Sequence, residues 1–233
     1  MKIAVINFSG NVGKSTVARH LLLPRIPGAE LIAIESLNTD EGQGQALRGR
    51  QFGELQEYLQ TVSSVVVDIG ASNVEELMGQ MQRYRGSHED FAAFVVPTVP
   101  ALKQQMDTIA TLIELSRLGV PTSRLKVVFN MLESGITVTQ AFDPLLAFLK
   151  QQPIARANPW CCLGANEIYA RLKGTKTDLA TLANDPTDYK ALIAQAKDTT
   201  DKVALAQKLA TRRLAIGVVP ELDACFAALE FMP

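Results

Sequence analysis

The sequence predicts an α/β fold, a doubly wound and mostly parallel β-sheet flanked by helices, with a helical C-terminal extension. Three observations lead to this prediction. Short apolar runs alternate with helical patterns through residue 154. The runs are almost continuously apolar, as in strands buried on both faces of a parallel sheet. The first run ends in a glycine-containing turn that opens into a helix, as in the βαβ units of doubly wound sheets.

The predicted strands are apolar runs rich in β-branched and aromatic residues. They are Ile3–Ile6, Leu31–Ile34, Val65–Ile69, Phe91–Val96 and Lys126–Phe129, with a shorter sixth strand at Ile154. Between them, apolar residues recur at helical spacing. This spacing predicts helices over Thr16–Leu23, Phe52–Thr61, Val74–Tyr84, Ala101–Leu118 and Val138–Lys150. Ligands of such folds bind at the carboxyl ends of the strands, so polar residues there are candidate site residues.

The pattern changes after residue 158 and becomes helix-rich. Turn signals separate three predicted helices, which are Asn166–Leu172, Thr187–Lys197 and Thr200–Leu214. We expect one domain over residues 1–233, with a ligand-binding core at 1–165 and a helical C-terminal part at 166–233. The last apolar stretch, residues 222–231, has acidic but no basic residues. We expect it to pack against the domain, because membrane-anchoring helices carry Lys or Arg on their polar face.

The turn after the first predicted strand has the composition of a phosphate-binding loop. Residues 3–16 read IAVINFSGNVGKST, so a strand, a glycine loop and a helix follow one another. Such loops bind phosphate through backbone amides at a helix start, here residues Gly10, Asn11, Val12, Gly13, Lys14, Ser15 and Thr16. Lys14 would contact the β- and γ-phosphates, and the Ser15 hydroxyl would bind Mg²⁺. The usual pattern has its first glycine at the position of Phe8, and Gly10 stands inside the loop instead.

An acidic residue near the end of the third predicted strand matches this chemistry. Asp68 follows Val65–Val67 and precedes Gly70. In phosphate-loop proteins an Asp so placed binds Mg²⁺ opposite the loop Ser. The turn at residues 70–73 is then in a position to sense the γ-phosphate, as switch loops do.

Three further strand ends carry candidate residues. Glu35 follows the second strand and Asp40 lies in the segment after it, and either one would position the attacking water or form a solvated acidic turn. Asn130 ends the fifth strand, where its amide is suited to an adenine edge or to a simple turn. Pro97 and Pro100 predict a stiff turn after the fourth strand, beside the nucleotide.

Composition limits the remaining function classes. The net charge is −1, which argues against a strong global attraction to nucleic acid. Direct DNA contact would need a local patch, such as Arg83 with Arg85 or Arg212 with Arg213. No apolar run is long enough for a membrane span, and no signal peptide is expected, so we expect a cytoplasmic location. The cysteines, Cys161, Cys162 and Cys225, have no zinc-site spacing and are expected to be buried or free thiols.

The order of these motifs resembles the ParA/MinD superfamily of P-loop ATPases. The matching segments are IAVINFSGNVGKST, IAIESLN, VVVDIGAS, FVVPTVP and KVVFNMLES, within residues 1–172. More narrowly, the opening NFSGNVGKS resembles StbB-type plasmid stability proteins. The resemblance implies a deviant Walker A loop, an ATP-dependent homodimer and slow ATP hydrolysis. It also implies a role in plasmid partition or DNA positioning, with a DNA-binding partner protein.

The resemblance also implies roles for individual residues. Lys14 would contact phosphate, Ser15 and Asp68 would attend Mg²⁺, Asn130 would contact adenine, and Pro97 would line the base pocket. Members of the superfamily carry a second lysine near the loop start, and its matching position here is Ser9. The second water-positioning acid of the family aligns with Leu37. We therefore expect nucleotide binding with very slow hydrolysis. The alternatives are a metabolic kinase or ligase and a nucleotide-binding module that does not hydrolyse.

Overall fold

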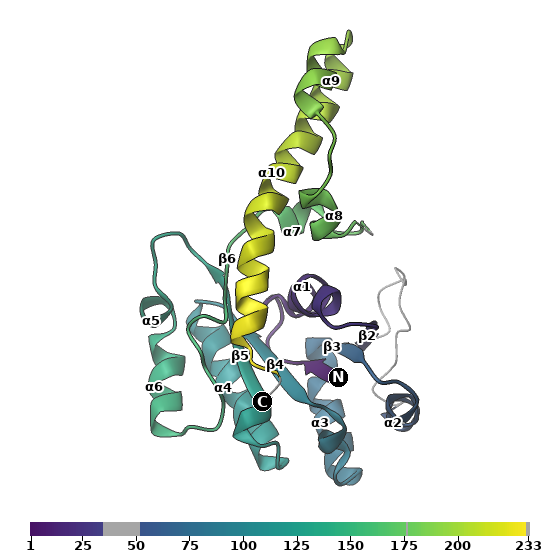
Figure 1. Ribbon diagram of the computed structural model, residues 1–233. Coiled ribbons are helices and arrows are strands. Elements are labelled where there is room, and N and C mark those ends of the chain that lie inside the picture. The colour runs from purple at the N-terminus through teal and green to yellow at the C-terminus, as the bar shows by residue number, and fades with distance from the viewer. Residues whose placement is uncertain (35–51, 176, 232–233) are drawn as a thin grey trace. The chain divides into compact units, whose positions relative to one another are not determined.

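The computed structural model describes residues 1–34, 52–175 and 177–231 of the chain. Its centre is a parallel sheet with the strand order β2-β3-β1-β4-β5-β6, built from every strand in the described ranges (Figure 1). The strands are β1 (Lys2–Val5), β2 (Glu30–Ile34), β3 (Val65–Ile69), β4 (Ala93–Thr98), β5 (Leu125–Leu132) and β6 (Cys162–Gly164). Each neighbouring pair is parallel. The predicted fold class is confirmed.

The winding direction reverses around β1. From β1 the chain passes to β2 at one edge, returns to β3, and then crosses to β4 on the other side of β1. β1 therefore lies between β3 and β4, with Val5 opposite both Asp68 and Val95. In open α/β sheets the crevice at such a switch point is where ligands bind. The loop that leaves β1 is placed there.

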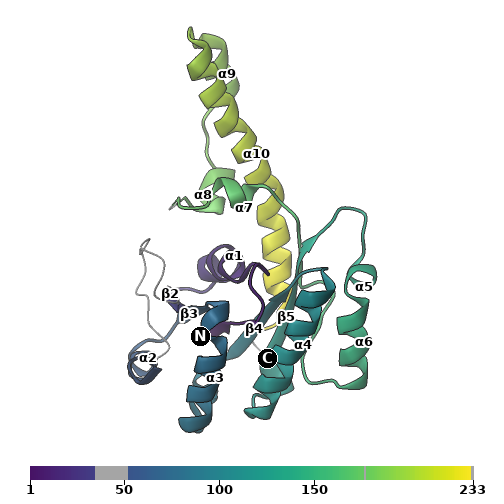
Figure 2. The ribbon, with the colours of Figure 1, turned by 180° about the vertical axis from the view of Figure 1, so that it is seen from behind.

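Strand residues alternate between the two faces of the sheet. Ala4 and Ile6 belong to one apolar cluster, together with residues of α2 (Phe52–Thr61), α3 (Val74–Arg83) and α4 (Leu102–Arg117). Figures 1 and 2 show α3 and α4 on one face of the sheet and α1 (Lys14–Thr16) on the other. Ile3 and Val5 are also fully buried. Both faces are therefore covered, which explains the continuous apolar runs in the sequence.

The helix that follows the loop widens after its first turn. α1 continues as Val17–Leu22 with π-type geometry, in which the Leu23 N–H donates to the Ala18 carbonyl five residues back. A short 3₁₀ turn, Leu23–Arg25, ends it. Such widened turns occur mainly as single insertions in helices, often at functional sites. The predicted helix over Thr16–Leu23 is thus present, with a different hydrogen-bond register.

Two sequence predictions in the second half of the core differ from the structure. The helix predicted over Val138–Lys150 is two helices, α5 (Val138–Ala141) and α6 (Asp143–Gln151), because Pro144 lacks an N–H and begins a new helix. The sixth strand is not at Ile154, whose N–H folds back to the Gln152 carbonyl. Pro153 cannot donate to a strand partner there. Pairing with β5 begins at Arg156, as an isolated bridge to Lys126, and the sixth strand itself is β6.

The cysteines are free thiols, as predicted. Cys161 and Cys225 are buried, and Cys162 is half-buried. Burial raises the pKa of Cys161 to about 12. A thiol with such a pKa is almost entirely protonated at neutral pH and is a poor nucleophile.

The chain divides into two compact units, residues 1–165 with 225–233, and residues 166–224. The second unit contains α7 (Ile168–Arg171), α8 (Leu179–Ala183), α9 (Tyr189–Gln195) and most of α10 (Thr199–Ala228). The sequence analysis missed α8 and ended the last helix at Leu214, whereas α10 continues to Ala228 with Pro220 inside it. No helix in the described ranges is both long and apolar enough to cross a membrane.

The end of the chain is attached to the first unit by hydrogen bonds to helix-end carbonyls. The Asn158 Nδ2 donates to the Ala228 carbonyl at 3.2 Å, and the Lys126 Nζ donates to the Glu230 carbonyl at 3.2 Å. Cys225 and Leu229 are buried. The prediction that this stretch packs against the domain is confirmed for residues 225–230.

Candidate functional site

In the loop between β1 and α1, the backbone conformation at residue 13 and the space around it are suited only to glycine. Gly13 has a φ of 84°, and Asn11 also lies in the left-handed region with a φ of 57°. A Cβ on Gly13 would lie 2.1 Å from the Asn130 Nδ2. The Gly13 carbonyl accepts the Val17 N–H at 2.9 Å, which starts the helix. Gly13 therefore allows the loop to turn into the helix while Asn130 lies directly beside it.

Lys14 lies across the inside of this loop. Its side chain is buried, and its ammonium donates to the Ser9 carbonyl at 2.6 Å and to the Asn7 carbonyl at 3.2 Å. Burial lowers the pKa of Lys14, and the nearby Asp68 carboxylate partly offsets this effect. A buried ammonium whose partners among the described residues are two carbonyls and a neighbouring carboxylate favours the arrival of further negative charge.

Asp68 and Ser15 approach the loop from two elements. Asp68 is buried near the carboxyl end of β3, directly opposite Val5. Ser15 is exposed in the first turn of α1, and α1 packs against β3. A hydroxyl and a carboxylate are ligands that Mg²⁺ accepts. The donor set beside Lys14 therefore fits a magnesium ion with bound phosphates.

Asn7 organises the loop, and the sequence analysis did not identify it. It is fully buried, and its Nδ2 donates to the Pro97 carbonyl at 2.9 Å and to the Thr108 Oγ1 at 2.8 Å. Its Oδ1 accepts the Ser9 N–H at 2.8 Å. One side chain thus joins β1, β4 and α4. The available signal was a polar residue directly after an apolar strand, inside the glycine loop.

Hydroxyl groups of α4 extend this network. The Thr111 Oγ1 accepts the Phe8 N–H at 3.0 Å, and the Thr108 Oγ1 donates to the Thr98 Oγ1 at 3.0 Å. Thr98, Thr108 and Thr111 are all fully buried. Because a buried polar network is costly unless each member is paired, the contacts restrict the loop to one arrangement.

Asn130 lies beneath the loop. It is buried in β5, and its Nδ2 donates to the Val12 carbonyl at 2.9 Å. The structure therefore brings Asn130 into contact with the loop of residues 10–16. A contact between Asn130 and adenine stays a prediction.

The sequence analysis predicted a turn at Pro97, but Pro97 is a strand residue. It lies within β4, opposite Val128 of β5. The Val95 carbonyl accepts the Ile6 N–H, so Pro97, two residues on, faces the same side just beyond the end of β1. Because β1 has already ended at this level, no β1 carbonyl lacks a donor where proline has no N–H. The Pro97 carbonyl accepts a hydrogen bond from the Asn7 side chain instead of from a strand.

Ser9 faces inward and is almost fully buried. The Lys103 ammonium, 2.9 Å from the Asp107 carboxylate, lowers the pKa of Asp107, and a hydrogen bond from the Ser9 side chain lowers it further. The position at which the resemblance implies a lysine thus carries a short, uncharged and buried side chain.

The remaining predicted residues surround this centre or lie outside it. Gly10 and Asn11 are exposed at the rim of the loop, Val12 is buried and Thr16 is half-buried. In the turn after β3, the Gly70 N–H and the Asn73 Nδ2 both donate to the Ile34 carbonyl. Glu35 and Asp40, the candidate water-positioning residues, lie outside the described residues, as does Leu37.

The similarity of this chain to known proteins lies in its fold and not in its sequence. No protein-family model and no curated protein sequence matches this chain. Among solved structures, it is similar to apo McdA of Cyanothece, with 13% identity, a TM-score of 0.49, and coverage of 89% of this chain and 98% of that one. It is also similar to the Mg-ADP complex of the septum site-determining protein MinD from Pyrococcus horikoshii, with 12% identity, a TM-score of 0.48, and coverage of 89% and 95%.

A third structure, the cell division ATPase MinD of Pyrococcus furiosus, has 12% identity, a TM-score of 0.47, and coverage of 89% of this chain and 97% of that one. At such identities the likeness is one of fold. The functional argument below therefore starts from the residues of the loop and their contacts.

Proposed function

We propose that this chain binds ATP with Mg²⁺ at the loop of residues 10–16 and acts as a ParA/MinD-like nucleotide-dependent switch. The observation that carries this proposal is the position of Lys14. Its ammonium lies inside a glycine loop at the switch point of the sheet, close enough to Asp68 for their charges to interact. Charge, backbone amides and a metal-ligating carboxylate together form a site for a nucleotide triphosphate.

Each loop residue has a defined task in this proposal. Lys14 exchanges the Ser9 and Asn7 carbonyls for phosphate oxygens, and the amides at the start of the helical run Lys14–Leu22 bind the same phosphates. Ser15 and Asp68 hold Mg²⁺, which neutralises phosphate charge. Asn130 and the Pro97 region are assigned to the adenine side.

Slow hydrolysis is part of the proposal. A cation that reaches the transferring phosphate is worth roughly 10³–10⁵ in rate in phosphoryl-transfer systems. Ser9 has no charge, and its short side chain is buried.

We assign the chain to plasmid stability or partition, as an ATP-dependent homodimer that recruits a DNA-binding partner protein.

A nucleotide-binding module without hydrolysis is the second candidate. The burial and small size of Ser9 favour it, because a short, uncharged side chain buried there cannot extend to a phosphate. Phosphate release from ATP over hours, with and without DNA and partner extract, separates the two candidates. Release above the protein-free blank supports the switch, and none under any condition supports the module.

The phosphate-loop assignment is tested by titrating ATP–Mg²⁺ into the purified protein and into Lys14→Ala. Loss of a charged donor to the phosphates should weaken binding about 10- to 100-fold. Lys150→Ala, which removes an exposed lysine of α6, serves as the control and should bind ATP as the wild type does. Equal affinity of Lys14→Ala and wild type would refute the assignment.

A further inference from the structure

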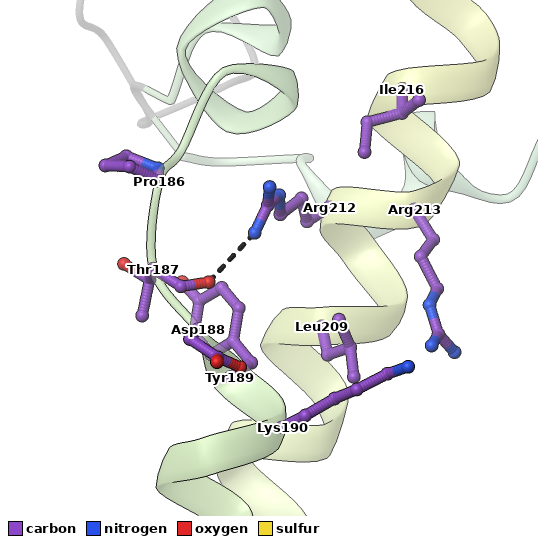
Figure 3. A pocket seen from close by; sticks show the side chains of 9 residues that line it. All are labelled: Pro186, Thr187, Asp188, Tyr189, Lys190, Leu209, Arg212, Arg213 and Ile216. Atoms are coloured by element: carbon purple, nitrogen blue, oxygen red, sulfur yellow. Dashed lines mark hydrogen bonds between the residues drawn. The ribbon is translucent and has the colours of Figure 1, made fainter.

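The helical unit of residues 166–224 contains a cavity of about 400 Å³ that the proposed function does not use (Figure 3). One wall is the turn before α9 and the first residues of α9. The other is a face of α10, with lining residues at positions 209, 212, 213 and 216. This spacing places them on one side of a helix. The arginine pair noted in the sequence therefore belongs to a defined pocket.

Cations line this pocket from both walls. Arg212 is held in place, because its Nη1 donates to the Thr187 carbonyl at 2.9 Å, and its Nε is buried with no acceptor in the described structure. Lys190 and Arg213 are exposed, and neither has an ion-pair partner among the residues the structure describes. In the view of Figure 3, the Lys190 side chain runs past Leu209 toward the side of α10 from which Arg213 projects.

The acidic residues beside the pocket already have other partners. Asp185 accepts hydrogen bonds from the Thr187 hydroxyl at 2.6 Å and the Tyr189 hydroxyl at 2.5 Å. The Asp188 Oδ1 accepts the Ala191 N–H at 3.0 Å and so caps α9. These bonds fix both carboxylates on the turn, where the Asp185 carboxylate also interacts with the charge of Arg212. Lys190 and Arg213, which form no ion pair among the residues that the structure describes, remain available to an anion from outside.

Apolar side chains flank the arginines. Leu209 and Ile216 lie one and a half to two turns apart on α10, on either side of Arg212 and Arg213. Ile216 is 48% exposed, although it is a large aliphatic residue. Pro186 adds a further apolar surface on the opposite wall. The pocket is thus matched to a ligand with negative charge at its centre and aliphatic groups at its ends.

The charge of the whole unit argues against a nucleic acid as this ligand. Residues 166–224 contain nine Lys or Arg and eight Asp or Glu. A phosphate backbone binds mainly through a broad excess of positive charge. Only three of these nine cations, Lys190, Arg212 and Arg213, line the pocket, and Asp188 also forms part of its lining. A compact anion fits these observations better than a polyanion.

We propose that the pocket between α9 and α10 binds a short acidic peptide segment of a partner protein, with one or two carboxylates on Arg213 and Lys190 and aliphatic residues against Leu209 and Ile216. Arg212, fixed to Thr187, shapes the floor and adds positive charge. This inference does not depend on nucleotide binding at the loop of residues 10–16.

The test uses the full-length protein on an array of hexapeptides in which two acidic residues are flanked by Leu, Ile or Val. A matched array replaces Asp and Glu by Asn and Gln. We expect binding to the acidic array and a loss of at least about tenfold in affinity for Arg213→Gln and Lys190→Gln, because each removes a charge-assisted hydrogen bond. Lys202→Gln, an exposed α10 lysine outside the pocket, should bind as the wild type does.

Circular dichroism melting of each variant establishes that it is folded, and both tested side chains are exposed. The proposal is overturned if no acidic peptide binds, if the amide array binds equally well, or if the pocket variants retain wild-type affinity. A labelled 20-base-pair DNA duplex is measured in parallel. Binding of the duplex that depends on Arg213, without peptide binding, would assign the pocket to nucleic acid instead.

Discussion

At the residue scale, Gly13 carries the tightest steric constraint in the loop. Gly13→Ala places a methyl group in the left-handed backbone region and against the buried Asn130 amide. We expect a loss of at least about 1 kcal/mol in the free energy of unfolding, since left-handed backbone alone costs this much. The melting temperature should fall by about 2–4 °C or more, and ATP binding should be lost.

Gly10→Ala is the matched control for this change. Gly10 is exposed, its φ is not positive, and a Cβ there would meet nothing within 4 Å. Thermal melting and ATP titration of both variants measure the difference. Equal melting temperatures and ATP affinities of Gly13→Ala and Gly10→Ala would show that the loop does not require a positive φ at residue 13.

Asn7 provides a second test at this scale. Asn7→Ala leaves the Pro97 carbonyl and the Ser9 N–H without their partners inside the protein. Each unpaired buried group costs about 1–3 kcal/mol, so we expect a loss of roughly 2–5 kcal/mol in stability by urea unfolding. Thr108→Ser keeps the hydroxyl that accepts from Asn7 and should cost much less. Similar losses in the two variants would show that the network does not hold the loop.

At the scale of elements, the turn before α9 has a stability that depends on pH. Hydrogen bonds from the side chains of Thr187 and Tyr189 and from the Thr187 backbone hold the pKa of Asp185 at about 2. The pKa of an unfolded Asp is about 3.9. Because the folded pKa is the lower one, Asp185 contributes stability above about pH 4, and this contribution is lost as the pH falls toward 2.

The expected result is a difference in urea midpoint between wild type and Asp185→Asn that is full at pH 5–7 and disappears near pH 2. A constant difference between wild type and Asp185→Asn across this range would contradict the assignment of the hydrogen bonds.

Elements also differ in how well their residues predict them. α2 begins and ends where the sequence pattern places it, because its apolar residues, Phe52, Leu55 and Leu59, form a regular buried stripe. β6 was missed because its three residues are too few for a periodic signal, and its pairing with β5 is decided by contacts across the sheet. α10 was predicted to end at Leu214, but it continues to Ala228 through Pro220, a residue that normally ends a helix.

At the scale of the whole molecule, the proposed switch predicts a change of mass with nucleotide. A γ-phosphate that contacts both the loop of residues 9–14 and the turn at 70–73 would make ATP and ADP states differ, as any ligand-driven switch requires. We expect light scattering to give a dimer mass with ATP–Mg²⁺ and a monomer mass with ADP. The Lys14→Ala variant should stay monomeric with both. An identical mass of the wild type with ATP and ADP would count against the switch.

The sequence by itself determined the fold class and pointed to the centre of the candidate site, because both rest on short-range patterns. Apolar runs specify buried parallel strands, and Gly13, Lys14 and Ser15 are consecutive, so their chemistry can be read without the fold. The tertiary structure alone decided how the loop is held. Asn7 meets Pro97 and Thr108, and Gly13 meets Asn130, across about a hundred residues of sequence. Such contacts follow from strand order and helix packing, which local residue patterns do not encode.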